Sequence, residues 1–307
     1  LIPEEETVIT FSESGYIKRL PPGTFRSQNR GGKGLIGSEV GDEDFLTQLM
    51  TAATHDNILF FTTRGRVFQT KVYEIPPASR TAKGKPIHNF LEIPLEEKIS
   101  AIISYPATQK KEVQDAYLVM ATRHGLIKKT LLTEFANVRR SGIIALSLRK
   151  DDTLQWVSLS SGSDEVLIAT DQGQAIRFRE STIRAMGRTA SGVHAIRLRK
   201  NDLVSSMNVV TGGVNANKTQ KLLVVMANGF GKQTPLSEYK VQGRGGSGIK
   251  TANITAKTGI LMAARLVSDQ KELLALSAKG QIIRTQLTDV RTAGRATQGV
   301  KIMSLNA

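Results

Sequence analysis

Six short windows of the chain carry the side chains best suited to bind a ligand. Each window holds two or three Arg or Lys residues and no Asp or Glu. Guanidinium and ammonium groups bind phosphate oxygens, and such contacts are largely independent of base sequence. The windows therefore predict a surface that binds a polyanion. Their fourteen basic residues are Arg26, Arg30, Lys33, Arg80, Lys83, Lys85, Arg139, Arg140, Arg184, Arg188, Lys240, Arg244, Arg291 and Arg295.

The composition supports a polyanionic partner. Lys and Arg number 42 against 27 Asp and Glu, a formal net charge of +15, and the windows account for nearly all of that excess. DNA or RNA is the first candidate, and an anionic membrane or an acidic protein is the second. Only 5% of the residues are aromatic, and no aromatic-rich strand face that could stack single-stranded bases is evident, which favours duplex DNA.

No comparable pattern supports catalysis. Residues 243–248 fit the motif G-x-G-x-x-G, but a strand-like segment follows them and no βαβ unit surrounds them. The sequence contains neither a phosphate-binding P-loop nor a nucleophile elbow. We therefore expect no catalytic residue, metal site or cofactor. The histidines, which lack metal-ligand spacing, and the tyrosines, which we expect to pack, are His55, His88, His124, His194, Tyr16, Tyr73, Tyr105, Tyr117 and Tyr239.

The windows occupy a fixed place in a sequence repeat. An apolar run, a turn with Gly and a second run with a basic residue recur six times, a pattern that predicts β-hairpins. A second glycine follows each turn glycine after 19 residues in five copies and after 17 in the third. This near-constant offset indicates a duplicated unit. The glycine pairs are Gly15 and Gly34, Gly65 and Gly84, Gly125 and Gly142, Gly173 and Gly192, Gly229 and Gly248, and Gly280 and Gly299.

The repeat predicts the fold class. Six units of about 51 residues, each with three or four short strands, are typical of an all-β, propeller-like ring with six blades of about four strands. We predict one domain over residues 1–307, and we interpret the apolar segment 45–50 as strand because the repeat places a strand there. The approximate repeats are 1–50, 51–105, 106–157, 158–209, 210–264 and 265–307.

Further features bear on the protein's location. The chain has no Cys, which excludes disulfides and fits a reducing cytoplasm. No run reaches the 18 or more apolar residues of a transmembrane helix, so no membrane partner is expected. The chain begins with Leu1 rather than Met, and we expect it to be part of a longer protein.

One heptapeptide resembles a known family signature. Residues 28–34 read QNRGGKG, which is similar to the gyrase A box, Gln-Arg-Arg-Gly-Gly-Lys-Gly, with Asn29 in place of an Arg. Other stretches also look like the C-terminal domain of bacterial DNA gyrase A subunits, so that the resemblance covers essentially the whole chain. These stretches are 54–76, 80–87, 184–193 and 294–300.

The resemblance implies a fold and a role. The fold would be a β-pinwheel, in which neighbouring blades exchange a strand and duplex DNA bends around a basic perimeter. The box would secure a wrap that lets gyrase introduce negative supercoils with ATP. Adjacent glycines also allow backbone amides to approach phosphates closely, although a tight turn that closes a blade would use the same glycines. The box residues expected to bind DNA are Gln28, Arg30, Gly31, Gly32, Lys33 and Gly34.

The resemblance also implies partners. The cleaving tyrosine would lie N-terminal to this chain, and the ATPase, with ATP and Mg²⁺, would lie in other domains. The chain would act in an A2B2 assembly with the rest of gyrase A and with gyrase B, would be associated with the nucleoid in the cytoplasm, and would be monomeric by itself.

Three alternatives remain open on the sequence alone. The equivalent domain of topoisomerase IV would have a lost or degraded box. A propeller scaffold for acidic proteins would bind a protein partner and would not bend DNA. An enzyme with its active site in the ring centre would need a convergent acid, base or metal cluster, and the sequence shows none.

Overall fold

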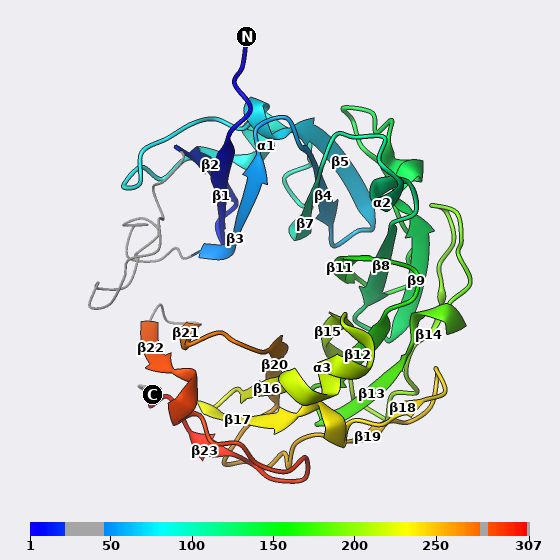
Figure 1. The fold of residues 1–307 in the computed structure, drawn as a ribbon, viewed down its shortest axis with the longest axis vertical. Coiled ribbons are helices and arrows are strands. Elements are labelled where there is room, and N and C mark those ends of the chain that lie inside the picture. Colours follow the sequence, from blue (N-terminus) through cyan, green and yellow to red (C-terminus); the bar gives the residue numbers. More distant parts are fainter. Residues whose placement is uncertain (22–45, 277–281, 306–307) are drawn as a thin grey trace. The chain divides into compact units, whose positions relative to one another are not determined.

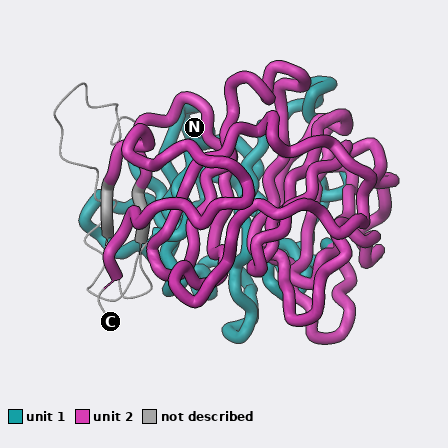
Figure 2. Tube along the Cα trace, turned by 90° about the horizontal axis from the view of Figure 1, so that it is seen from below, with its two compact units in different colours: residues 1–114, 133–145, 278–280 teal, residues 115–132, 146–277, 281–307 magenta. Residues whose placement is uncertain are grey.

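A computed structural model describes residues 1–21, 46–276 and 282–305. The predicted box at 28–34, together with Arg26, lies outside these residues. The chain divides into two compact units, shown in two colours in Figure 2. Unit 1 consists mainly of residues 1–114 and 133–145, and unit 2 mainly of residues 115–132, 146–277 and 281–307.

Unit 1 contains two four-stranded sheets, both visible in Figure 1. In each of them a β-hairpin forms the centre, and a long strand and a two-residue strand flank it on opposite sides. The predicted strand at 45–50 is confirmed from Leu46 onward, where β3 starts. The sheets are, in spatial order, β3 (Leu46–Ala53), β1 (Glu6–Ser12), β2 (Tyr16–Leu20) and β6 (Lys85–Pro86), and β10 (Ile143–Ile144), β5 (Arg66–Lys71), β4 (Asn57–Thr62) and β7 (Ile99–Tyr105).

Unit 2 repeats this arrangement in three sheets and adds a two-stranded sheet. Its sheets are β11 (Leu154–Ser160), β8 (Tyr117–Thr122), β9 (Leu126–Leu131) and β14 (Val193–His194); β15 (Val204–Val210), β12 (Glu165–Thr170), β13 (Gln174–Arg179) and β18 (Val241–Gln242), with β19 (Ile249–Lys250) also on β13; β20 (Leu261–Val267), β16 (Lys221–Met226), β17 (Phe230–Pro235) and β23 (Val300–Lys301); and β21 (Glu272–Leu276) with β22 (Ile282–Gln286).

The helices of the described residues are three to seven residues long, and none is long and apolar enough to cross a membrane. Each 3-10 turn among them directly follows the second strand of a hairpin. The helical segments are α1 (Ile87–Phe90), α2 (Lys111–Gln114), α3 (Gly213–Thr219), η1 (Val72–Glu74), η2 (Leu132–Phe135), η3 (Glu180–Thr182), η4 (Leu236–Glu238) and η5 (Leu287–Asp289). The all-β prediction is therefore confirmed. Six complete blades are not, because the described part of the last repeat contributes one hairpin.

The two-residue strands show that neighbouring repeats exchange a strand. β6 belongs to the second repeat in sequence but pairs antiparallel with β2 of the first, through Tyr16 and Pro86 and through Ile17 and Lys85. The strands β10, β14, β19 and β23 pair in the same way with a hairpin of the preceding repeat. The exchange that the resemblance implied is confirmed in these five sheets. Each of these five sheets therefore includes a strand from the following repeat.

The hairpin turns explain the first glycine of each repeat. Gly125 has a φ of +88°, in the left-handed region that favours glycine. Its N–H donates to the Thr122 carbonyl at 3.1 Å, and the N–H of the next residue, Leu126, donates to the Thr122 hydroxyl, also at 3.1 Å. The other described turn glycines share this positive φ.

The second glycine permits the exchange. Gly192 has a φ of +92°, and a Cβ at this position would lie 2.4 Å from the carbonyl oxygen of Ile127 in β9. A Cβ at Gly84, Gly248 or Gly299 would likewise lie 2.4–2.5 Å from a carbonyl oxygen of the receiving hairpin. Only a residue without a side chain lets the exchanged strand approach this closely.

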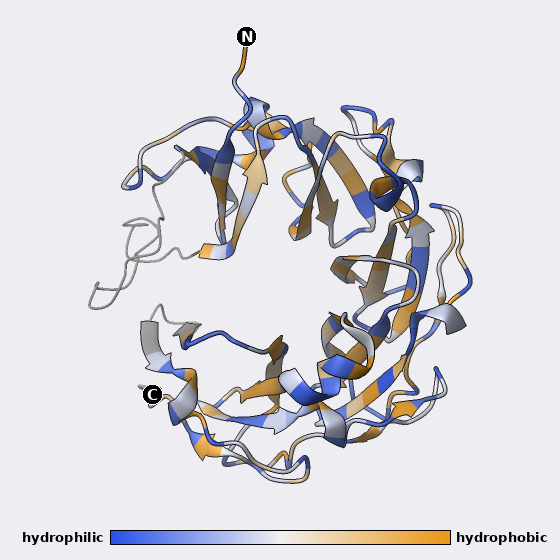
Figure 3. Ribbon diagram, viewed as in Figure 1, coloured by the Kyte–Doolittle hydropathy of each residue, from blue (hydrophilic) through white to orange (hydrophobic). Residues whose placement is uncertain are grey.

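The core lies within and between the sheets, where the central strands are largely apolar (Figure 3). In unit 1, Ile58, Phe60 and Phe68 are fully buried in one cluster. In unit 2, one cluster forms around Val119 and Ile176 and another around Val224 and Leu261. Burial of these side chains, at about 1.5–3 kcal/mol each, drives the hairpins together.

Candidate nucleic-acid interface

The predicted basic windows lie in the loops that lead into the exchanged strands. We call these segments the exchange loops, and they comprise residues 76–84, 136–142, 184–192, 240–248 and 291–299. Four of them begin at a parallel pairing with the receiving hairpin, three through a single bridge and the loop 240–248 through β18, and all end at the antiparallel exchanged strand. Each of these four loops is therefore attached at both ends to one strand of the preceding repeat.

Most of the predicted phosphate-binding side chains are accessible. Of those in the described residues, eight are exposed and three are half-buried. The half-buried side chains are Arg188, Arg244 and Arg295, and the exposed ones are Arg80, Lys83, Lys85, Arg139, Arg140, Arg184, Lys240 and Arg291. Exposed cations at the same place in successive repeats can contact phosphates spaced along a duplex.

Two half-buried arginines also make structural contacts. Arg244 donates to the carbonyl of His194 at 2.6 Å and to that of Thr182 at 3.2 Å. Arg295 donates to the carbonyl of Lys250 at 3.1 Å. The acceptors His194 and Lys250 are equivalent, because each lies two residues after the last glycine of the preceding exchange loop, Gly192 or Gly248. These arginines therefore connect neighbouring repeats, and part of their charge serves the scaffold.

Two of the exposed side chains have weakly held neighbours. Lys83 lies over the ring of Tyr16, with its ammonium 4.0 Å from the ring centroid. Arg140 lies 3.7 Å from Glu92, and both of these side chains are more than half exposed. A pair so exposed contributes about 0–1 kcal/mol, so Arg140 can exchange this partner for a phosphate at little cost.

Beneath three exchange loops lies a buried lysine that the sequence did not single out. Lys18, Lys128 and Lys232 are at most 1% exposed. Their ammonium groups donate to backbone carbonyls of the loop above: Lys128, for example, reaches Gly187 at 3.1 Å and Arg188 at 2.7 Å. The available signal was a Lys three residues after the turn glycine in alternate repeats.

Burial lowers the pKa of two of these lysines, Lys18 and Lys232. Loss of hydration lowers the pKa of Lys18. It also lowers the pKa of Lys232 to about 8, although the nearby Glu238 carboxylate opposes the change, while Arg295 and Lys250 reinforce it. A low-dielectric site disfavours the charged form of a lysine.

The residue four positions after the turn glycine forms a second layer of contacts, as Arg177 in the fourth repeat and as Lys129 in the third. Arg177 is 3% exposed, donates to Glu165 at 2.6 Å and to Asn217 at 2.6 Å, and reaches the carbonyls of Leu236 and Tyr239. In another repeat Lys129 lies 3.7 Å from the fully buried Glu180. These polar groups hold the 3-10 turns from which the exchange loops start.

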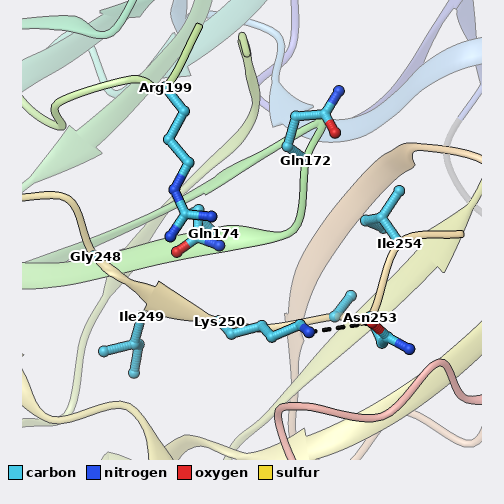
Figure 4. Close-up of a pocket in the computed structure, with 9 residues that line it drawn as sticks. Gln172, Gln174, Arg199, Gly248, Ile249, Lys250, Asn253 and Ile254 are labelled. Carbon is cyan, nitrogen blue, oxygen red and sulfur yellow. Dashed lines mark hydrogen bonds between the residues drawn. The ribbon is translucent and has the colours of Figure 1, made fainter. Parts of the chain in front are cut away.

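A cavity of about 360 Å³ lies beside the exchange loop 240–248 (Figure 4). Gln174, Arg199 and Lys250 line it, and Lys250 donates to Asn253 at 3.1 Å. Pockets for small molecules are predominantly apolar with a few placed polar groups, whereas this lining is mostly polar. The cavity therefore does not indicate a substrate site.

The motifs rejected from the sequence alone have structural explanations. Residues 243–248 lead into β19, a strand, so the helix that a dinucleotide site requires is not formed there. Tyr239 and Tyr105 are buried, as expected for packing side chains, and burial raises the pKa of both. Among the residues that the structure describes, no group of three His, Cys, Asp or Glu side chains could hold a metal ion.

Comparison with known proteins identifies the family. A family model described as the DNA gyrase C-terminal domain, a beta-propeller, matches residues 6–53, 56–103, 116–161, 164–211, 220–268 and 271–307. The chain belongs to this family. The family model matches in six segments, the same number as the repeats predicted from the glycine pairs. The resemblance to gyrase A is confirmed.

Relatives agree with this assignment. The DNA gyrase A subunit of Staphylococcus epidermidis (strain ATCC 12228 / FDA PCI 1200) is 45% identical over 305 residues, which are 99% of this chain and 33% of the relative. That of Staphylococcus aureus (strain NCTC 8325 / PS 47) is also 45% identical over 305 residues, 99% of this chain and 34% of the relative. The chain thus spans about one third of the length of these proteins.

Two solved structures share the fold. A DNA gyrase A C-terminal domain superposes with a TM-score of 0.76 at 25% identity and covers 98% of this chain and 96% of its own. The C-terminal domain of a DNA topoisomerase IV superposes with a TM-score of 0.80 at 23% identity and covers 99% of this chain and 90% of its own. The fold alone therefore does not separate the two types of enzyme, whereas the gyrase relatives at 45% identity favour gyrase.

Proposed function

We propose that this chain is a non-catalytic domain that bends and wraps duplex DNA, so that a DNA gyrase can introduce negative supercoils with ATP. The observation that carries the proposal is the recurrence of exposed Arg and Lys side chains in the exchange loops of successive repeats. Membership of the gyrase A C-terminal domain family supports it. We propose further that the six repeats act as one wrapping domain, with the N-terminal part of gyrase A and gyrase B as partners.

The magnitudes require several loops to act together. Turning ~40 bp through ~180° costs on the order of 10 kcal/mol, given a persistence length of ~150 bp. Non-specific affinity of ~10⁻⁵ M corresponds to only about 7 kcal/mol. A single basic loop therefore cannot hold the bend, and several repeats must contribute along the path of the DNA. The box residues, among them Arg30 and Lys33, would secure one end of this path.

A topology assay tests the proposal. A closed plasmid is relaxed by a type I topoisomerase while this chain is bound, and the protein is then removed. We expect a linking-number shift that grows with protein concentration, in the positive sense that gyrase requires. Binding in the same buffer with no shift would contradict wrapping, and tight binding to an acidic protein instead would favour the scaffold alternative.

Matched variants locate the interface. Arg139→Ala with Arg140→Ala removes two charges from an exchange loop, whereas Lys110→Ala with Lys111→Ala removes two exposed charges elsewhere in unit 1. The loop variant should reduce the salt dependence of DNA affinity by about 0.9 for each phosphate interaction that it removes. The control should leave the slope almost unchanged, and equal slopes for both variants would contradict a specific role for the loops. In the holoenzyme, Arg30→Ala with Lys33→Ala should reduce supercoiling and leave DNA cleavage intact.

A further inference from the structure

The first five repeats are of two kinds, distinguished by one buried residue. Three residues after the turn glycine, the first, third and fifth repeats carry Lys18, Lys128 and Lys232, whereas the second and fourth carry Phe68 and Ile176. All five side chains are buried at the same place under an exchange loop. The three lysines alone add a charge there, so the loops fall into two structural classes.

The lysines contact equivalent atoms in their loops. Lys18 donates to the carbonyls of Ser79 at 3.3 Å, Arg80 at 2.8 Å and Ala82 at 2.7 Å. Lys232 donates to the corresponding carbonyls in the loop that covers the fifth repeat, those of Gly294 at 2.8 Å, Arg295 at 2.6 Å and Thr297 at 2.9 Å. An ammonium group has three N–H donors, and three carbonyls use all of them.

We propose that Lys18, Lys128 and Lys232 are positioning residues for DNA binding: each buried ammonium fixes the curled backbone of the exchange loop above it, so that the basic side chains of that loop are held outward before DNA arrives. This inference rests on the proposed function. One of the carbonyls that each lysine holds belongs to an arginine of the predicted interface, Arg80, Arg188 or Arg295. The lysine therefore fixes the very peptide unit that carries a phosphate-binding candidate.

The energetic cost of burying a charge favours a specific role for these lysines over simple filling of the core. A buried ammonium without compensation is costly, and an apolar side chain of similar length would avoid that cost. Phe68 and Ile176 show that the site under an exchange loop accepts apolar side chains. A loop with inward-facing carbonyls, however, needs a donor, because carbonyls buried without a partner are themselves costly.

Order in the free loop then lowers the cost of binding. A loop that is already curled loses less conformational freedom when its side chains contact phosphates. The exchange loop 76–84 offers the clearest case. Lys83 directly follows Ala82, whose carbonyl accepts from Lys18. The Lys83 side chain is exposed, and its ammonium lies over the Tyr16 ring.

The test compares two methionine variants of the whole chain. Lys18→Met removes the ammonium and keeps the length of the side chain, and Ile176→Met places the same residue at the same position of a repeat whose loop has no lysine. Hydrogen exchange without DNA should become at least about ten-fold faster in residues 79–83 of Lys18→Met and should stay unchanged in residues 243–247 of Ile176→Met. Unchanged exchange in 79–83, with the variant folded, would overturn the proposal.

A double-mutant cycle distinguishes a positioning role from general destabilisation of the fold. Lys18→Met and Lys83→Ala should each weaken duplex binding about ten-fold and reduce the salt slope by about 0.9, and the double variant should be no weaker than either single variant. Additive effects would show that Lys18 does not act through Lys83 and would overturn the proposal. If the parent chain shows no salt-dependent binding, the proposed function fails, whereas the exchange measurement still tests whether the lysine orders the loop.

Discussion

Gly192→Ala tests the physical basis of the strand exchange. The new Cβ would lie 2.4 Å from the Ile127 carbonyl oxygen and 2.9 Å from its carbon, closer than real Cβ contacts allow. The φ of +92° adds strain of about 1–3 kcal/mol for a residue with a side chain. Relief of the contact would require β14 to move away from β9, at about 1 kcal/mol for each broken backbone hydrogen bond. We expect a loss of roughly 3 kcal/mol or more in the free energy of unfolding.

The same loop offers a matched control. A Cβ at Gly187 would meet no atom within 4 Å, and this glycine does not have a left-handed φ. Gly187→Ala should therefore change the free energy of unfolding by only about 0.5 kcal/mol, and in the direction of a gain, because alanine restricts the unfolded chain.

Denaturant unfolding followed by the fluorescence of Trp156 measures both variants. Trp156 is the only tryptophan and lies in β11, in the sheet that β14 completes. Amide exchange at Ala195, whose N–H donates to the Gly125 carbonyl at 2.8 Å, reports the docking of the exchanged strand directly. If Gly192→Ala and Gly187→Ala had equal stability and equal protection at Ala195, the argument from close approach would be refuted.

Two further predictions concern buried charge. Glu180 is fully buried beside Lys129, whereas Glu92 pairs with Arg140 at the surface. In urea unfolding, Glu180→Ala should lower the free energy of unfolding by about 3–5 kcal/mol and Glu92→Ala by less than about 1 kcal/mol. Similar losses for the two variants would contradict the argument from burial. Burial lowers the folded-state pKa of Lys232 to about 8 from 10.5, so between these values the unfolded chain binds more protons and stability rises with pH. From about pH 7 to about pH 9 the parent should gain on the order of 1 kcal/mol over Lys232→Met, and parallel pH profiles would exclude a depressed pKa.

Part of the fold could be predicted because glycine has few substitutes. The spacing of Gly125 and Gly142 from their equivalents revealed the repeat, since a left-handed φ or a close backbone approach requires glycine in each copy that the structure describes. The reason for the second glycine could not be read from the sequence, because its steric partner lies in another repeat. A two-residue strand such as β14 is also too short to give a periodic signal, so strand exchange came only from the family resemblance.

The candidate site was predicted in its exposed part and missed in its buried part. Arg and Lys in glycine-rich loops are recognisable as surface cations, and Arg139 and Arg184 are exposed as expected. Lys18 and Lys128 were missed because lysine is almost never fully buried, and only the three-dimensional path of the loop places carbonyls around the ammonium. The box predictions at 28–34 lie outside the described residues and stay predictions.

Strand exchange also determines how long each hairpin edge stays uncovered while the ribosome synthesises the chain. The hairpin of β1 and β2 is complete when Leu20 has been made, but the strand that covers its free edge begins at Lys85. At about 5–20 residues per second, the ribosome leaves that edge open for roughly 3–13 s, and each later hairpin waits in turn. An open edge is a template for pairing with another chain. Slow codons between a hairpin and its partner strand should therefore promote aggregation of the nascent protein, and the same codons placed after the exchanged strand should not.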